Sequence, residues 1–299
     1  MSKVLISGGS GLVGTRLTEL LNEKGYQVAI LSTRKNFTHK NAEVYYWNIA
    51  KEEIEEGAFE NTEHIIHLAG AGVADSRWTE NRKKEIYDSR IDTTKLFYKY
   101  LSQMKHSVKT FLSTSAIGIY EKDSGEILKE DTPPADNFLA KVCIDWEKEA
   151  NEIENLGIRV AIIRTGIVLD LDGGAMKEML KTAPVFLSTL GNGKQIYSWI
   201  HIEDLCNMYI HALENQKVNG AYNGVAPNAV SQKAIMESIK KQKYTLAPIV
   251  PAPSFALKIA LGEMSEVVLG SQHCSAEKIQ STGFEFQFDT IDKAIKDLL

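Results

Sequence analysis

Eight residues near the start of the chain decide the fold: Ser7-Gly8-Gly9-Ser10-Gly11-Leu12-Val13-Gly14. The run that precedes them, residues 3–7, is apolar and predicts a strand. Residues 12–24 carry apolar side chains at helical spacing and predict an amphipathic helix. A glycine-rich turn between a first strand and a first helix is typical of a dinucleotide-binding βαβ unit.

Each glycine of this loop has a physical reason. Gly8 permits the tight turn, Gly11 lets the backbone approach a pyrophosphate, and Gly14 lets the helix pack closely on the strand. The helix N-terminus adds free N–H groups and a favourable dipole for an anion. We therefore predict that the whole loop contacts a dinucleotide, through Gly8, Gly9, Ser10, Gly11, Leu12, Val13 and Gly14.

The first half of the chain continues the alternation of short β-rich runs and helical patterns. Further strands are predicted at 27–32, 43–47, 64–68, 110–114 and 159–164, and further helices at 79–103 and 137–156. Such alternation predicts an α/β fold: a Rossmann-type, doubly wound parallel sheet with helices on both faces.

The second half is broken by proline and glycine. Residues 248–253 hold three prolines and predict a stiff, extended connector, followed by a helix at 254–261. We predict a cofactor-binding core at 1–170, with further core segments near 195–225. Residues 171–299 would form mainly a smaller substrate-side cap over the ligand edge of the sheet, with its last segment at about 248–299.

Composition excludes several classes of protein. The 299 residues are 43% hydrophobic and 24% charged with a net charge of −5, which are ordinary globular values. No basic run points to nucleic acid or an anionic membrane surface, and no apolar stretch reaches the roughly 20 residues of a membrane helix. The chain starts directly in a strand, without the apolar region of a signal peptide. The three cysteines are widely spaced, so we expect no metal site and a cytoplasmic protein.

Motifs along the whole chain support a family resemblance. The glycine spacing is GxxGxxG, and it is followed by His67-Leu-Ala-Gly70, Leu112-Ser-Thr-Ser-Ala-Ile-Gly-Ile-Tyr120, Arg164-Thr-Gly-Ile-Val-Leu169 and Trp199-Ile-His-Ile-Glu-Asp204. In these features the chain resembles the extended, epimerase-like branch of the short-chain dehydrogenase/reductases.

Three more segments narrow the resemblance: Ala74-Asp-Ser-Arg-Trp-Thr-Glu80, Ser89-Arg90 and Gly262-Glu-Met-Ser-Glu-Val-Val-Leu-Gly270. They are similar to those of nucleoside-diphosphate-sugar-epimerase-like proteins with a small C-terminal domain of their own, often called epimerase family proteins. Helix-mediated dimers are common among the proteins that the chain resembles, so a homodimer is one expectation.

The end of the second predicted strand bears on the choice of cofactor. In NAD-preferring Rossmann proteins this strand ends in a carboxylate that binds the ribose hydroxyls. Here Ser32 stands at that position, and Arg34 and Lys35 follow. Because a guanidinium can bind a 2′-phosphate with charge-assisted hydrogen bonds, we predict NADP(H), contacted by Ser32, Arg34 and Lys35.

The resemblance also implies a catalytic Tyr, Lys and Ser. Ser115 fits the serine position and Lys141 the lysine position, where it would also contact the ribose. The pattern then requires Tyr at 137, but the sequence has Asn137, which cannot do the acid/base work of a phenol. Three explanations stay open: Tyr120 reaches the substrate, water or a substrate group carries the proton, or the protein binds without catalysing.

Other predicted contacts follow from the same resemblance. Further cofactor contacts are expected from Leu68, Ala69, Gly70, Ser113, Gly166 and Ile167. Candidate substrate contacts are Arg77, Trp78, Arg90 and His201, since Arg and Trp offer donors and a stacking face to an anionic group. Asp204 is expected to cap a helix at 205–214.

Three functions remain as hypotheses. The first is an NADP(H)-dependent oxidoreductase acting on a small carbonyl or alcohol, or on a nucleotide-linked substrate. The second is a nucleoside-diphosphate-sugar epimerase, and Asn137 counts against it because that reaction needs an acid/base. The third is a catalytically inactive NADP(H)-binding regulator, which needs no proton donor.

Overall fold

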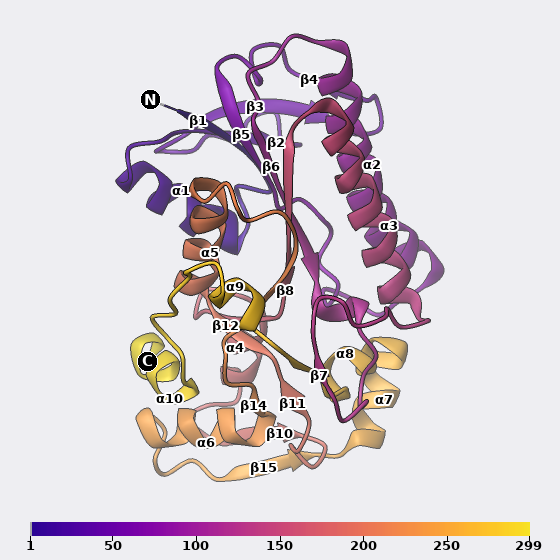
Figure 1. Cartoon of the computed structure of the whole chain (residues 1–299). Coiled ribbons are helices and arrows are strands. Elements are labelled where there is room, and N and C mark those ends of the chain that lie inside the picture. The colour runs from indigo at the N-terminus through magenta and orange to yellow at the C-terminus, as the bar shows by residue number, and fades with distance from the viewer. Residues whose placement is uncertain (1) are drawn as a thin grey trace.

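The computed structural model describes residues 2–299 and is built around one eight-stranded sheet (Figure 1). The strand order is β13-β8-β6-β5-β1-β2-β3-β4, and every neighbouring pair is parallel except β3 and β4. The strands are β1 (Lys3–Ser7), β2 (Gln27–Ser32), β3 (Glu43–Asn48), β4 (Glu53–Ile54), β5 (Thr62–His67), β6 (Thr110–Ala116), β8 (Arg159–Thr165) and β13 (Gly220–Gly224). The predicted Rossmann-type sheet is confirmed.

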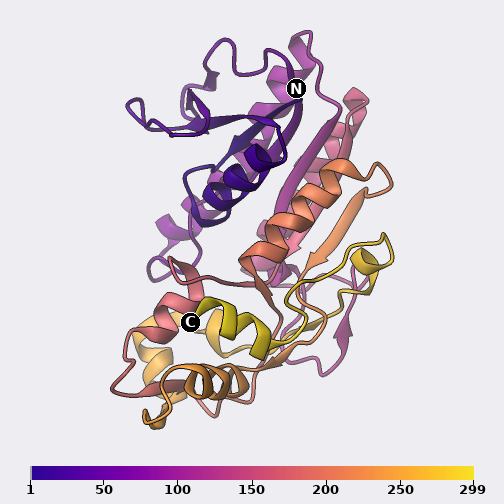
Figure 2. The same ribbon diagram turned by 90° about the vertical axis from the view of Figure 1, so that its left-hand side faces the viewer.

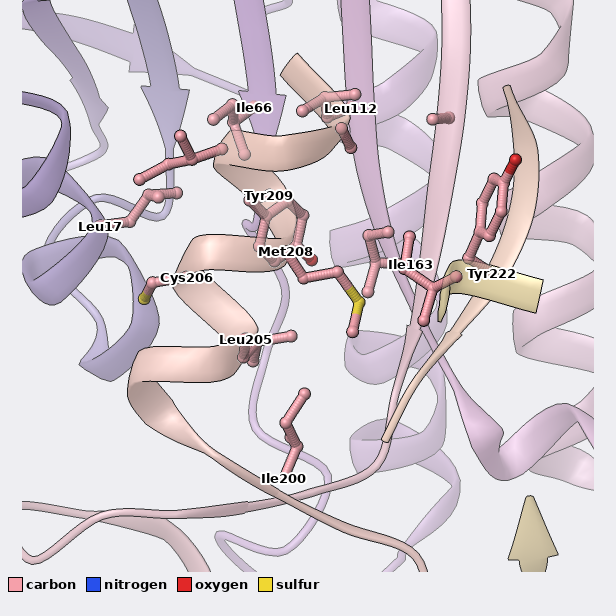
Figure 3. Close-up of a cluster of buried hydrophobic side chains, with 14 of the residues drawn as sticks. Leu17, Ile66, Leu112, Ile163, Ile200, Leu205, Cys206, Met208, Tyr209 and Tyr222 are labelled. Atoms are coloured by element: carbon pink, nitrogen blue, oxygen red, sulfur yellow. The ribbon is translucent and has the colours of Figure 1, made fainter. Parts of the chain in front are cut away.

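Helices cover both faces of this sheet. On one face lie α1 (Leu12–Glu23) and α5 (Ile202–Glu214), and on the other α2 (Glu80–Gln103) and α3 (Phe138–Glu152) (Figure 1). Alternate strand residues supply the two cores, because successive side chains of a strand point to opposite faces. Figure 3 shows the α1/α5 side, where Leu205 and Met208 of α5 lie against the sheet with Leu112 of β6.

The C-terminal chain forms a smaller lobe at the carboxyl ends of the strands (Figures 1 and 2). Its core packs Trp199 and Leu169 against Met236 and Ile295. The remaining elements are β7 (Ile127–Leu128), β9 (Ile167–Leu169), α4 (Gly174–Leu180), β10 (Leu187–Leu190), β11 (Ile196–Tyr197), β12 (Trp199–His201), β14 (Val230–Ser231), α6 (Gln232–Gln242), β15 (Ile249–Ala252), α7 (Ser254–Leu261), α8 (Ser265–Leu269), β16 (His273–Cys274), α9 (Glu277–Gln280) and α10 (Ile291–Leu298), with 3-10 turns at Ile117–Ile119, Ile153–Leu156 and Gly262–Met264.

Two local expectations need correction. The proline-rich segment 248–253 is extended, but it is a paired strand rather than a free connector: β15 runs parallel to β10, with Pro251 opposite Thr189. Asp204 does not cap α5, since the N-cap is His201, whose Nδ1 accepts a hydrogen bond from the Glu203 N–H. Asp204 instead accepts the backbone N–H groups of Gln287 and Phe288, and so fastens the C-terminal segment to α5.

The structure also bears on membranes, metals and thiols. Among residues 2–299, no helix is both long enough and apolar enough to cross a membrane. The same residues contain no cluster of three or more His, Cys, Asp or Glu side chains that could hold a metal ion. Cys143, Cys206 and Cys274 are all buried, and no disulfide joins them.

Candidate active site

The glycine loop has the geometry that a phosphate cradle needs. Gly8 has φ +75°, and a Cβ there would lie 2.8 Å from the carbonyl carbon of Leu68. A Cβ on Gly14 would overlap the Gly8 carbonyl oxygen and lie 2.6 Å from Gly9 Cα. A Cβ on Gly11 would meet only the Gly8 oxygen, at 3.3 Å. Gly8 and Gly14 therefore shape the loop, while Gly11 leaves the N-terminus of α1 open to a ligand.

A groove of about 770 Å³ runs from this loop along the ends of β1, β2 and β5. Gly8 and Ser10 of the glycine loop line it, together with Ala69 and Gly70, which follow β5. Trp47 and Ile49, which the sequence analysis did not single out, also line it. The position of β3 in the sheet would have indicated them, because β3 pairs with β2, Trp47 belongs to β3 and Ile49 follows it.

The end of β2 shapes one wall of the groove. Ser32 Oγ accepts a hydrogen bond of 3.1 Å from the Arg34 N–H, and both residues line the groove. The exposed Arg34 guanidinium lies 4.4 Å from the centre of the Phe37 ring. Within residues 2–299 no carboxylate forms an ion pair with Arg34, so its charge is available for an anion. Lys35 points elsewhere, with its Nζ 5.3 Å from the centre of the Tyr46 ring.

A second, smaller cavity of about 190 Å³ lies beneath the glycine loop. Leu12 and Val13 line it together with Leu68, and the hydroxyl-bearing Thr114 and Thr165 form its other side. Thr114 Oγ1 and Thr165 Oγ1 are 3.2 Å apart. The strand alternation explains why Thr114 rather than Ser113 faces this side, since Ser113 points to the opposite face of β6.

A third cavity, of about 260 Å³, is the most enclosed of the three. Its walls come from the ends of β6 and β8, from α3, and from the C-terminal segment that contributes Val267, Gly270 and Gln272. Gly166 and Ile167 line it, and Gly166 has no room for a side chain because a Cβ would overlap the Ser198 carbonyl oxygen. Gly8 lines both the groove and the smaller cavity, and Thr165 lines both the smaller and the enclosed cavity, so the three follow one another along the carboxyl edge of the sheet.

The register of α3 differs from the one expected. Asn137 is the N-cap, and its Oδ1 accepts a hydrogen bond of 3.0 Å from the Ala140 N–H. Lys141 lies on the exposed side of the helix. The α3 side chains that line the enclosed cavity are Leu139, Val142, Cys143 and Trp146, and among them Leu139 and Cys143 are four residues apart, as in the family pattern. The placement of Lys141 therefore does not support a ribose contact.

Ser115 and Tyr120 belong to a buried polar network on the α3 side of the sheet. Ser115 Oγ donates to Glu147 at 2.7 Å, and Arg164 donates two hydrogen bonds of 2.8 Å to the same carboxylate. Arg164 Nη1 also donates to the Tyr120 hydroxyl, which in turn donates to Asn223 Oδ1, both at 2.7 Å. Burial raises the pKa of Tyr120 far above its usual value, so the phenol stays protonated. Both hydroxyls are engaged in this network in the structure, and their catalytic roles stay predictions.

Of the four candidate substrate residues, Arg90 alone is placed at the enclosed cavity. Trp78 donates its indole N–H to the Val73 carbonyl at 2.9 Å, and Arg77 is exposed beside Gly262. His201 is buried, with its ring stacked 3.8 Å from that of Phe288. His201 thus caps α5 and stacks on Phe288, and it does not line the enclosed cavity.

Comparison with known proteins identifies the family. The sequence profile described as the NAD dependent epimerase/dehydratase family matches residues 4–223, and a domain of unknown function, DUF1731, matches residues 252–298. The chain belongs to the NAD dependent epimerase/dehydratase family. Its C-terminal lobe thus carries a second, separately recognised domain.

Relatives of similar length share the whole architecture. The epimerase family protein SSP1921 of Staphylococcus saprophyticus subsp. saprophyticus is 34% identical over the full length of both chains. YfhF of Bacillus subtilis is also 34% identical, over 99% of this chain and 97% of its own. The crystal structure of the human epimerase family protein SDR39U1 with NADPH is 27% identical, with a TM-score of 0.89 over 99% and 98% of the two chains. A UDP-galactose 4-epimerase at 17% identity and TM-score 0.77 shows the fold alone.

Within this family fold, the present chain has no tyrosine at the cavity-facing helix positions. Leu139 is apolar, and burial raises the pKa of the Cys143 thiol to about 11. A thiol with that pKa is neutral at pH 7 and a poor partner for proton exchange. These two helix positions therefore offer no group for conventional tyrosine acid/base chemistry.

Proposed function

We propose that the protein binds NADP(H) along the groove and exchanges a hydride with a small, largely apolar substrate in the enclosed cavity. The observation that carries this proposal is the succession of three neighbouring cavities, each sharing a lining residue with the next, from Arg34 at one end, past the glycine loop, to Gly166 at the other. A dinucleotide needs such a track along the carboxyl ends of the strands, with its reactive end beside a substrate.

The residues of the chain fit the cofactor. The open N-terminus of α1 at Gly11 offers N–H groups and a positive dipole to the pyrophosphate. Arg34 would hold a 2′-phosphate, and Ser32 in place of a carboxylate removes the repulsion. The human relative was crystallised with NADPH, which supports this choice, whereas a UDP-glucuronic acid 4-epimerase of the same fold was crystallised with NAD. The bound cofactor supplies or accepts the hydride.

The chain's own contribution is binding, orientation and exclusion of water. Leu139, Trp146 and Ile167 give the enclosed cavity apolar walls, and Val267 from the C-terminal segment helps to cover it. A low-polarity, covered site keeps water from competing with the substrate. The cavity holds a single lining guanidinium, from Arg90, which is too little cationic charge for the two phosphates of a nucleotide sugar. We therefore favour a small substrate over a nucleotide-linked one.

A binding regulator without turnover is the second candidate. Leu139 and Cys143 favour it, because neither supplies the proton of a conventional carbonyl reduction. Epimerisation is compatible with the family, but it would need an acid/base from outside this helix face.

Direct hydride tracing separates these functions. The protein is titrated with NADPH, NADP⁺, NADH and NAD⁺ by tryptophan fluorescence, then incubated with deuterated [4-²H]NADPH and a panel of small carbonyl compounds. Deuterium in a product supports the oxidoreductase. Phosphate-selective binding without transfer supports the regulator, and absence of binding to all four nucleotides overturns the proposal.

A further inference from the structure

The enclosed cavity lacks a side chain suited to donate a proton. Among residues 2–299, its lining side chains with exchangeable protons are Arg90, Cys143, Trp146, Thr165, Tyr197, Ser198 and Gln272. The Trp146 indole N–H is buried without a hydrogen-bond partner, but an indole can only donate a hydrogen bond and is far too weak an acid to give up its proton. The Tyr197 hydroxyl donates to the Val268 carbonyl at 2.6 Å, and burial raises the pKa of Tyr197 to about 12. Ser198 Oγ donates to the Gln272 carbonyl at 2.8 Å. These hydroxyls are thus engaged with backbone.

Arg90 is the exception, because its charge has no partner. Its Nη1 donates to the carbonyls of Ala71 and Ile86, at 3.1 and 2.8 Å. In the described chain, residues 2–299, no carboxylate pairs with it and its Nε and Nη2 make no hydrogen bond. The guanidinium lies 5.1 Å from the centre of the Trp146 ring. A desolvated cation with free N–H groups beside an apolar cavity is suited to bind an oxyanion.

The Arg90 guanidinium lies between the cofactor groove and the substrate cavity. A Cβ on Gly70, which lines the groove, would be 3.2 Å from Arg90 Cζ, while Trp146 lines the enclosed cavity. An oxygen bound by Arg90 would therefore belong to a molecule next to the cofactor. The small volume, about 260 Å³, is below the roughly 300–1,000 Å³ of pockets for drug-sized ligands.

These features decide which acceptor the site can reduce. Hydride addition to a saturated ketone produces a strongly basic alkoxide, which needs a proton from the enzyme in the same step. Addition to the β-carbon of a conjugated carbonyl sends the electrons to oxygen as an enolate, which is far less basic. A guanidinium can hold that oxyanion until water protonates it.

We propose that the physiological acceptor is a small, apolar, conjugated carbonyl compound, an enone, whose oxygen is bound by Arg90. This inference rests on the proposed hydride transfer. For an enone, the hydride from the reduced nicotinamide forms a C–H bond at the β-carbon, the C=C π electrons shift toward the carbonyl oxygen, and the cofactor becomes oxidised. Water then supplies the proton at the α-carbon, so charge and atoms balance without a side-chain acid.

A matched pair of acceptors tests the proposal with the full-length protein and NADPH. Cyclohex-2-enone and cyclohexanone have the same ring and differ by the conjugated double bond. We expect kcat/KM for the enone to exceed that for the saturated ketone by at least about 100-fold, because the ketone needs general acid catalysis, which contributes about 10²–10⁴-fold in other enzymes. With [4-²H]NADPH the β-carbon gains deuterium, and in D₂O with unlabelled NADPH the α-carbon gains it.

Variants at Arg90 complete the test. R90M should lower enone reduction about 100-fold and leave the Kd for NADPH within about threefold, whereas R90K, which keeps the charge, should recover part of the loss. K148M is the matched control, because Lys148 is an exposed cation on α3 away from the cavities, and it should behave as the parent protein. NADPH affinity and thermal midpoint report whether R90M is folded.

The outcomes separate the two proposals. Equal reduction of cyclohexanone and the enone, or full activity of R90M, overturns the conjugated-acceptor proposal while hydride transfer stands. Transfer of deuterium to saturated carbonyls alone has the same consequence. Absence of transfer to every acceptor, despite NADPH binding, overturns the proposed oxidoreductase function itself.

Discussion

Arg34 and Lys35 are neighbours in sequence, yet their surroundings differ. Arg34 lines the cofactor groove, and Lys35 turns to the Tyr46 ring. At the sequence level both side chains were predicted to contact the cofactor. The distinction depends on where the loop turns after β2, where Ser32 Oγ accepts the Arg34 N–H. That turn gives the two adjacent cations different directions.

R34A should therefore lower selectivity for NADPH over NADH by about 10- to 100-fold, the effect of losing charge-assisted hydrogen bonds worth roughly 1.5–3 kcal/mol. Dissociation constants from fluorescence titration measure it. K35A removes the same formal charge from the same loop and should change the ratio by less than about threefold. Unchanged selectivity in R34A, or an equal loss in K35A, would contradict the assignment.

Ser115 carries a second prediction at this scale. Its hydroxyl donates to the Glu147 carboxylate inside a buried network rather than to the cavities. S115A should lower the free energy of unfolding by about 1–2 kcal/mol, because a buried carboxylate loses one of its donors. Thermal unfolding measures the loss, and the exposed S102A should stay within about 0.5 kcal/mol of the parent. Loss of NADPH binding or of all turnover in a folded S115A protein would return Ser115 to the active site.

At the scale of elements, local sequence patterns were sufficient to predict where a strand or a helix forms. They were not sufficient to predict how a helix is rotated about its own axis. The strand–glycine–helix unit was predictable because its determinants lie within about 20 contiguous residues. The α3 helix was also predictable, but not its rotation. The YxxxK pattern placed Asn137 and Lys141 at the site, whereas Asn137 is used as the N-cap and Leu139 and Cys143 face the cavity. The cap and the first cavity position lie two residues apart, and that difference changes which side chains line the cavity.

The glycine loop offers a prediction at this scale. G11A should weaken NADPH binding at least about tenfold while changing the free energy of unfolding by less than about 1 kcal/mol, because its Cβ enters the phosphate side with only one contact, 3.3 Å to the Gly8 oxygen. G14A should weaken binding and stability together, because its Cβ would overlap that oxygen. Titration and urea unfolding of both variants check this. A fully stable G14A protein would show that the loop can shift.

At the scale of the whole molecule, the enclosed cavity escaped prediction because its walls are distant in sequence. Val73, Cys143, Ile196 and Val267 meet there only after the C-terminal lobe has folded onto the sheet. The cap over the ligand edge was expected in outline. The hydrogen bonds that hold the cap in place were not expected. Gln272 Nε2 donates to the carbonyls of Ile117 and Tyr120, at 3.0 and 2.8 Å. Such side chain–backbone contacts leave no periodic trace in a sequence.

The division into a cofactor side and a substrate side gives the last prediction. Val267 lines the enclosed cavity, so V267W should fill it and lower hydride transfer at least about tenfold while NADPH affinity stays within about threefold. I259W is the matched control, because Ile259 lies 72% exposed on α7 of the same C-terminal domain. Kd and single-turnover transfer rates, measured side by side, separate the two effects. Equal loss of binding and transfer in V267W would mean that the C-terminal domain covers the cofactor as well as the substrate.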